Sequence, residues 1–129
     1  MKLLICGGRD FRDRDLIYAT LDGVLARNAP LVLIVGYNPR DPKYQGADQI
    51  AYQWAVERKV GYTTFPADWG TQGRAAGPIR NKRMRDSGRP THCIAFPTPG
   101  EPNKGTKGMC ALMEEVDVKP WVVASDLKE

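Results

Sequence analysis

The sequence has few cysteines, a single histidine and no long apolar run. Its three cysteines, Cys6, Cys93 and Cys110, are widely spaced and form no CxxC pair, which argues against a disulfide framework and a zinc site. No stretch reaches the roughly 18 apolar residues of a membrane span, and the opening run 3–6 is too short for a signal peptide. We therefore expect a cytoplasmic protein that binds no metal, cofactor or membrane.

The size and composition suit one globular domain. The chain has 129 residues, of which 42% are hydrophobic, and this is enough for one core but leaves no room for a second domain. We expect a domain over residues 1–124 and a polar, frayed tail over 125–129. The net charge of +4 favours anionic partners in general, whether nucleotide, phosphate or nucleic acid.

Short β-rich runs alternate with longer helical patterns along the chain. The candidate strands are residues 2–6, 31–35, 62–65, 92–96 and 121–123. The candidate helices are residues 13–27, 47–59, 77–87 and 106–116. This alternation predicts an α/β protein, a single Rossmann-like domain with a mostly parallel five-stranded sheet and helices on both faces. We expect Cys6 and Cys93 to be buried in adjacent core strands.

The segment ICGGRDF, residues 5–11, ends the first candidate strand in two glycines. In parallel sheets, ligands bind beyond the carboxyl ends of the strands, where helix starts expose backbone N–H groups. Gly7 and Gly8 would let a phosphate or sugar approach the backbone, and Arg9 offers donors for an anion. The alternative is a plain turn with Arg9 and Asp10 solvated or paired, because the GxGxxG fingerprint is absent.

Similar loops follow the second and third candidate strands. After the second, Gly46, Ala47 and Asp48 stand at a helix start. There Asp48 either caps the helix or complements its dipole, or it contacts a ribose hydroxyl. After the third, residues 69–77 read as an irregular glycine-bearing loop. Trp69 in that loop is a candidate for stacking on a base or lining a cleft.

Two further groups of candidates stand at helix starts near the same edge of the sheet. Gly77 precedes a helix that carries Arg80 and Asn81, and the loop after the fourth strand supplies Gly105 and Thr106. Other basic residues on the first of these helices could form a nucleic-acid face, but a solvated surface is the more ordinary role. Four glycine-bearing strand ends are therefore expected to meet at one edge.

Four motifs in this order resemble the SLOG superfamily, in its YspA-like and YpsA-like branch. They are GGRDF, GAD, DWG followed by AGPIRNKRM, and AFP leading into KGTKGM, and the resemblance spans about residues 3–123. The superfamily also contains Lonely-guy phosphoribohydrolases, DprA/Smf DNA-binding proteins and sensor domains of bacterial anti-phage systems. The resemblance implies a Rossmann-like domain that binds a nucleotide-derived ligand, often as a homo-oligomer, with ligand contacts beside Gly77.

The chain departs from the Lonely-guy pattern in its fourth loop. Those enzymes carry PGGxGTxxE, whose glutamate serves glycosidic chemistry, whereas the run here continues from Thr106 to Met109. The loop is also expanded by residues 101–104, and a second insertion occupies residues 37–45. In that insertion Lys43 and Tyr44 either form a lid over a base or belong to a solvated loop.

The leading hypothesis is a protein of sensor or sequestering type that binds ADP-ribose, a cyclic ADP-ribose isomer or a nucleoside monophosphate. The glycine loops at residues 7–8 and 105–106 would hold phosphate, Arg9 and Arg80 would supply charge, and Asp48 or Asn81 would contact ribose. One alternative is an N-glycosidic hydrolase that uses Asp48 or Glu101 as its carboxylate. A second alternative, suggested by the charge, is DNA binding in the DprA manner.

Overall fold

The computed structural model describes residues 1–127, so the last two residues of the expected tail lie outside the described part. Its five strands form one fully parallel sheet in the order β3-β2-β1-β4-β5, where a mostly parallel sheet was expected. The strands are β1 (Lys2–Gly7), β2 (Val32–Val35), β3 (Gly61–Thr64), β4 (His92–Phe96) and β5 (Trp121–Val122). The predicted α/β class and Rossmann-like architecture are confirmed.

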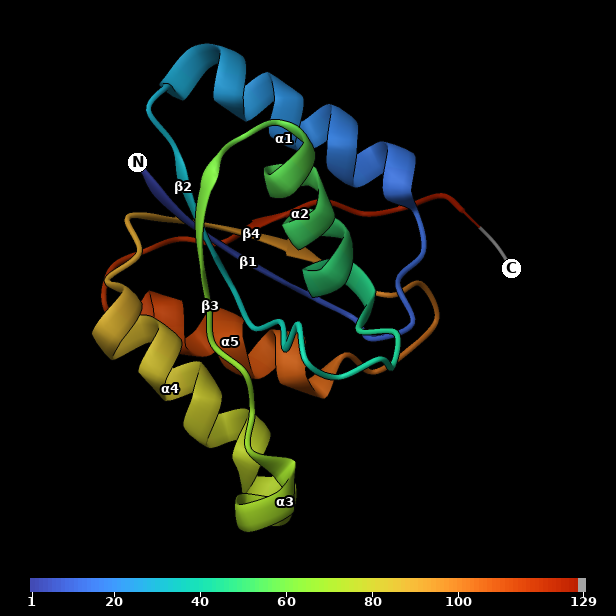
Figure 1. The fold of residues 1–129 in the computed structure, drawn as a ribbon, viewed down its shortest axis with the longest axis vertical. Coiled ribbons are helices and arrows are strands. Elements are labelled where there is room, and N and C mark those ends of the chain that lie inside the picture. The colour runs from blue at the N-terminus through green and yellow to red at the C-terminus, as the bar shows by residue number, and fades with distance from the viewer. Residues whose placement is uncertain (128–129) are drawn as a thin grey trace.

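The helices cover both faces of the sheet, as predicted. One face carries α1 (Arg14–Asn28) and α2 (Gly46–Glu57), and the other carries α4 (Ala76–Gly88) and α5 (Lys104–Glu114) (Figure 1). A short helix α3 (Trp69–Gln72) and a 3₁₀ turn (Gly73–Ala75) lead into α4. In the part of the chain that the structure describes, no helix has the length and apolar character needed to cross a bilayer.

Alternating strand residues divide the interior into two cores. In β1, Leu3 and Ile5 face the core beneath α1 and α2, whereas Leu4 and Cys6 face the core beneath α4 and α5. This is the alternation that the two-residue period of a strand produces when both faces are covered. Cys6 and Cys93 are 7% and 3% exposed and lie in the neighbouring strands β1 and β4, which confirms the prediction for both cysteines.

The expectation of an irregular loop over residues 69–77 was wrong for its first part. Residues Trp69–Gln72 form a helical turn because Asp68 caps it, with Asp68 Oδ1 accepting from the backbone N–H of Thr71 at 3.2 Å. Such a cap satisfies one of the N–H groups that a helix start leaves without a partner. The turn places the Trp69 side chain against Gly77 in the first turn of α4.

The strand ends pack against one another through two glycines. A Cβ atom on Gly46, whose φ is +61°, would lie 2.1 Å from the carbonyl oxygen of Gly8. A Cβ atom on Gly8 would lie 1.7 Å from Thr98 Oγ1. The loop after β1 is therefore enclosed by the start of α2 and the loop after β4, and packing accounts for glycine at both positions.

The first residue of the expected tail contacts α1. Asp13 caps that helix by accepting from the Leu16 N–H at 3.2 Å, and its second oxygen accepts from the Ser125 hydroxyl at 2.5 Å. The backbone N–H of Leu127 in turn donates to Ser125 Oγ at 3.0 Å. Residues 125–127 thus run beside the loop that follows β1.

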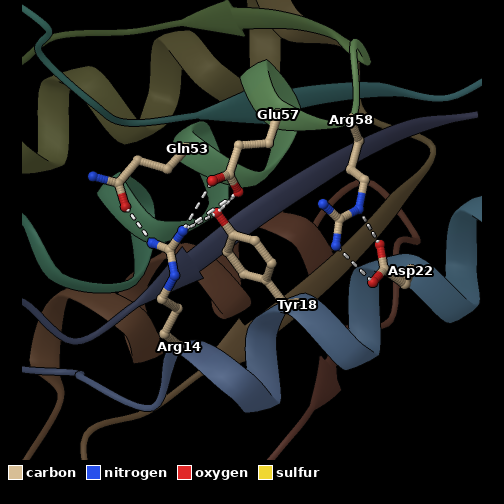
Figure 2. Close-up of polar contacts among 6 residues, drawn as sticks. All are labelled: Arg14, Tyr18, Asp22, Gln53, Glu57 and Arg58. Atoms are coloured by element: carbon tan, nitrogen blue, oxygen red, sulfur yellow. Dashed lines mark hydrogen bonds and ion pairs between the residues drawn. The ribbon is translucent and has the colours of Figure 1, made fainter.

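A polar cluster joins α1 to α2 on the outer surface (Figure 2). Arg14 donates to Gln53 at 2.7 Å and to Glu57 at 3.3 Å, and the Tyr18 hydroxyl also donates to Glu57. Burial and this hydrogen bond raise the pKa of Tyr18 to about 12. The tyrosine therefore stays neutral over the physiological pH range and acts as a structural donor.

The same surface offers a test of the packing between α1 and α2. Asp22 Oδ1 accepts from Trp54 Nε1 and from Arg58 Nε, each at 2.8 Å, and the Trp54 side chain is fully buried. Replacing Asp22 with Ala should lower the free energy of unfolding by roughly 1–3 kcal/mol, because a buried indole N–H loses its acceptor. Urea unfolding at pH 7 measures the loss.

Asp22→Asn is the matched variant, because its amide oxygen can still accept from Trp54 while the charge opposite Arg58 is lost. We expect this variant to lose less than about 1 kcal/mol, the range of an exposed ion pair. If both variants lost the same free energy of unfolding, the hydrogen bond from the Trp54 indole to Asp22 would contribute nothing to stability.

Candidate functional site

A cavity of about 660 Å³ opens at the carboxyl edge of the sheet, between α4 and α5. Its volume lies within the range of small-molecule sites, about 300–1,000 Å³. The lining residues come from β1 and its loop, the first turn of α2, the α3 turn, and the N-terminal parts of α4 and α5 as far as Met84 and Leu112. Elements that are distant in sequence therefore contribute to one concave surface, as the parallel topology requires.

The floor of the cavity is apolar. Cys6 of β1, Met84 of α4, and Met109 and Leu112 of α5 form it, and all four belong to or pack against the core beneath α4 and α5. Met109 is 1% exposed and packs into the core beneath α4 and α5. The position of the Lonely-guy glutamate thus carries a buried thioether, which neither donates nor accepts a proton.

One wall is the start of α5, which has no side-chain cap. Asn103 precedes the helix, but its side chain faces back to its own loop: Oδ1 accepts from the Thr98 N–H at 2.8 Å and Nδ2 donates to the Thr98 carbonyl at 2.9 Å. The first turn contains no acidic residue, and Lys104, Gly105 and Thr106 all line the cavity. An uncapped helix start of this kind favours an anion.

Asp48, the third residue of α2, forms another part of the cavity wall. Its Oδ1 atom is shielded from solvent and has no hydrogen-bond partner within residues 1–127. Burial raises the pKa of Asp48 to about 6, although Arg80 and Arg9 oppose the shift. The role of helix cap considered for Asp48 was wrong, because Gln45 precedes the helix and no side chain caps it, but Asp48 does lie in the first turn, where its charge complements the helix dipole. Asp48 is instead a buried acceptor that lacks a donor.

Arg80 anchors this wall to two strand ends. Its Nη1 donates to the carbonyl of Gly36 at 2.6 Å and to the carbonyl of Phe65 at 3.4 Å. Its Nε donates to Asn81 Oδ1 at 2.9 Å. Burial lowers the pKa of Arg80, while the nearby Asp48 carboxylate acts in the opposite direction. Arg80 therefore has both a structural role and a charge that faces the cavity.

Trp69 and Arg9 both line the cavity and contact each other. The Arg9 guanidinium lies 4.6 Å from the centroid of a Trp69 ring, in a cation–π arrangement. The indole edge lies over Gly77, where a Cβ atom would come within 3.2 Å of it. Trp69 is 43% exposed, so an aromatic surface remains open to a ligand.

The structure brings most of the predicted site residues together and separates the rest. Those that line the cavity are Gly7, Arg9, Asp48, Trp69, Gly77, Arg80, Asn81, Gly105 and Thr106. Gly8, Gly46 and Ala47 are not in the lining and belong to the packed contact between loops. Asp10 lines a separate pocket of about 360 Å³ beside Ser125, and Glu101 is exposed outside the main cavity.

Several lining residues were not predicted from the sequence. Lys82 and Lys104 add positive charge, and Pro78 and Gly108 complete the rim. The spacing of Gly105, Gly108, Met109 and Leu112 at three to four residues was an available signal, because such residues share one face of a helix. No local pattern marked the two lysines, since exposed lysines are ordinary at helix starts and surfaces.

Two of the basic residues of α4, Arg80 and Arg85, are engaged in contacts within the protein. Arg85 pairs with Asp86 at 2.7 Å and with Glu115 at 2.6 Å, and Arg80 is directed at backbone carbonyls. Within residues 1–127, no three His, Cys, Asp or Glu side chains converge in a manner that could hold a metal ion.

Comparisons with known proteins agree with this architecture. A family model described as YAcAr, the YspA, cpYpsA-related SLOG family, matches residues 1–71, which is more than half of the chain. The chain is also similar to the Gene 61 protein of Mycobacterium phage D29, at 35% identity over 101 residues. That alignment covers 74% of this chain and 76% of the phage protein.

Proposed function

Because the chain belongs to the YspA, cpYpsA-related SLOG family, we propose that its cavity binds a nucleotide-derived small molecule, as a sensor or sequestering protein. Candidate ligands are ADP-ribose, a cyclic ADP-ribose isomer and nucleoside monophosphates. The observation that carries the proposal is that one cavity combines an uncapped helix start with the partnerless Oδ1 atom of Asp48. The first suits a phosphate and the second suits a hydroxyl donor.

The lining supports one orientation of such a ligand. A phosphate at the start of α5 would accept from backbone N–H groups, with Lys104 adding charge. A ribose against α2 and α4 would donate a hydroxyl to Asp48 and contact Asn81. A base would stack on the open face of Trp69. The cavity thus offers a separate contact for the phosphate, the ribose and the base of a nucleotide.

Gly105→Val tests the phosphate position. A Cβ atom on Gly105 meets nothing within 4 Å, so valine should fit the fold while projecting into the space where a phosphate would sit. We expect AMP and ADP-ribose to bind the variant at least about 30-fold more weakly than the parent, because two or more N–H contacts to an anion are lost. Isothermal titration calorimetry measures both ligands.

Gly23→Val is the matched control. Gly23 lies within α1, outside the cavity, and a Cβ atom there also meets nothing within 4 Å. The variant Gly23→Val also places a valine in a helix but does not touch the cavity, so it should bind AMP and ADP-ribose as the parent does. Unchanged affinity in Gly105→Val, or the same loss in both variants, would refute the phosphate assignment.

A second candidate function is hydrolysis of an N-glycosidic bond, and the raised pKa of Asp48 favours it. A carboxyl whose pKa lies near 6 is suited to general acid–base work at neutral pH. The hydrolase function is opposed by Met109, which occupies the position that the Lonely-guy resemblance assigns to the catalytic glutamate. Binding without rapid turnover is therefore the function that we favour.

Nucleic-acid binding receives less support from the site. The charges of α4 that suggested it are partly neutralised by Asp86 and Glu115. A nucleic-acid interface would also show a steep loss of affinity with salt, whereas the concave site predicts binding of free nucleotides.

A further inference from the structure

A second, smaller chamber adjoins the main cavity. Its volume is about 90 Å³, and it shares Arg9, Asp48, Trp69 and Arg80 with the lining of the larger cavity. Its other side is formed by the segment 36–45, which includes the insertion singled out in the sequence. The shared residues therefore stand between two spaces, with the buried carboxyl of Asp48 at the boundary.

The inserted loop is held in place by its own hydrogen bonds. Gln45 Oε1 accepts from the Asn38 N–H at 2.9 Å, and Gln45 Nε2 donates to the Asn38 carbonyl at 3.0 Å and to the Asp41 carbonyl at 3.3 Å. The Tyr44 hydroxyl donates to the carbonyl of Phe11, which joins the loop to the segment after β1. The chamber thus has a defined wall, and binding there need not order the loop.

The charges around the small chamber favour an anion. Three cations line it, Arg9, Lys43 and Arg80, against the carboxyls of Asp41 and Asp48. Asp41 Oδ1 already accepts from the Lys43 backbone N–H at 3.0 Å. Among residues 1–127, neither Arg9 nor Lys43 has a carboxylate ion-pair partner.

The size of the chamber limits what it can accept. With about 90 Å³, against about 660 Å³ for the main cavity, it has room for one compact group such as a phosphate, and a base or a sugar would not fit. Of these two spaces, the start of α5, the other position suited to a phosphate, lines the main cavity alone, and Lys43 lines the small chamber alone, whereas Asp48, the proposed ribose contact, lines both. The two anion positions therefore flank the place proposed for the ribose.

We propose that residues 37–45 form a second anion subsite, centred on Lys43 and Arg9, for a nucleotide that carries anionic groups on both sides of its ribose. This inference rests on the proposed function, because it uses the ribose position assigned there. The 5′-phosphate occupies the start of α5, and a phosphate on the opposite edge of the ribose enters the small chamber. The inserted loop is thus a specificity determinant for the second phosphate.

The test compares adenosine 3′,5′-bisphosphate with AMP by calorimetry at pH 7. The parent protein should bind the bisphosphate at least about tenfold more tightly, which corresponds to one charge-assisted contact. Lys43→Ala should bring the two affinities to within about threefold of each other while leaving the affinity for AMP unchanged. Lys119→Ala, which removes an exposed lysine that lines neither space, is the matched charge control and should keep the preference.

The outcomes separate this proposal from the proposed function. Equal affinities in the parent, or a preference that survives Lys43→Ala, would overturn the second subsite while leaving nucleotide binding intact. Failure of both compounds to bind the parent would overturn the proposed function itself, and the subsite with it.

Discussion

Replacing Asp48 with Asn is expected to make the protein more stable at pH 8 and to weaken its nucleotide binding. The pKa of this carboxyl is raised from 3.8 to about 6 in the folded state because the group is buried without a donor. Below pH 3.8 the group is protonated whether the chain is folded or unfolded, so it adds no pH-dependent penalty. As pH rises from there to about 6, the folded state holds a proton that the unfolded chain releases, and stability falls.

Above about pH 6 the penalty is complete, and it amounts to roughly 2–3 kcal/mol at about 1.4 kcal/mol per unit of pKa shift. Asparagine has nearly the same shape and no charge, so the variant should recover most of that free energy at pH 8. At pH 3.5 the parent carboxyl is already neutral, and the two proteins should be nearly equal in stability. Urea unfolding at both pH values measures the difference.

Asp126→Asn, an exposed aspartate outside the cavity, is the control and should show no such pH-dependent gain. In the same Asp48→Asn protein, affinity for AMP should fall about tenfold, because an ionised acceptor for the ribose hydroxyl is replaced by a weaker neutral one. A variant that is more stable than the parent but binds AMP more weakly is expected when the replaced residue serves binding at a cost in stability. A variant with no gain at pH 8, or with equal gains at both pH values, would contradict the buried-carboxyl account.

The second large effect concerns turnover. Purified protein incubated with AMP, NAD, ADP-ribose or cyclic ADP-ribose should return each compound unchanged over many minutes. Glycosidic cleavage needs stabilisation of positive charge on the ribose and a positioned carboxylate, and Met109 supplies neither. Loss of such a group typically costs about 100- to 10,000-fold in rate. Chromatography of the free base and ribose phosphate measures the outcome.

Asp48→Asn and Glu101→Gln decide the source of any activity that appears. Asp48 lies in the cavity wall, whereas Glu101 is exposed and outside the lining. We therefore expect any hydrolysis of the N-glycosidic bond to depend on Asp48 and not on Glu101. Several turnovers per second on any of the four compounds, abolished by Asp48→Asn, would replace the binding function with the hydrolase function.

The order of the elements could be predicted because local patterns determine it here. The apolar runs of β1 and β4 and the glycine-rich segments after them indicated a parallel sheet with ligand-facing loops at one edge. That topology alone brought Arg9, Asp48 and Arg80 to one cavity, although many residues separate them in the sequence. Their grouping could therefore be predicted from the sequence, because it follows from the order and direction of the strands.

Other features depend on contacts that no local pattern encodes. The opening pair of glycines suggested an approach for a ligand, yet Gly8 faces Thr98 of the loop after β4. The raised pKa of Asp48 arises from burial, which depends on how the loops close over α2. The small chamber formed by residues 36–45 likewise depends on the hydrogen bonds of Gln45 within the folded loop. These features required the three-dimensional structure.

The most direct test of the nucleotide site is a crystal structure of the protein grown with AMP. We expect electron density in the cavity between α4 and α5, with a phosphate within hydrogen-bond distance of the backbone N–H of Gly105 or Thr106 and a ribose hydroxyl within hydrogen-bond distance of Asp48. Density for AMP in the separate pocket beside Asp10 and Ser125, or a cavity that stays empty at saturating AMP, would contradict this expectation.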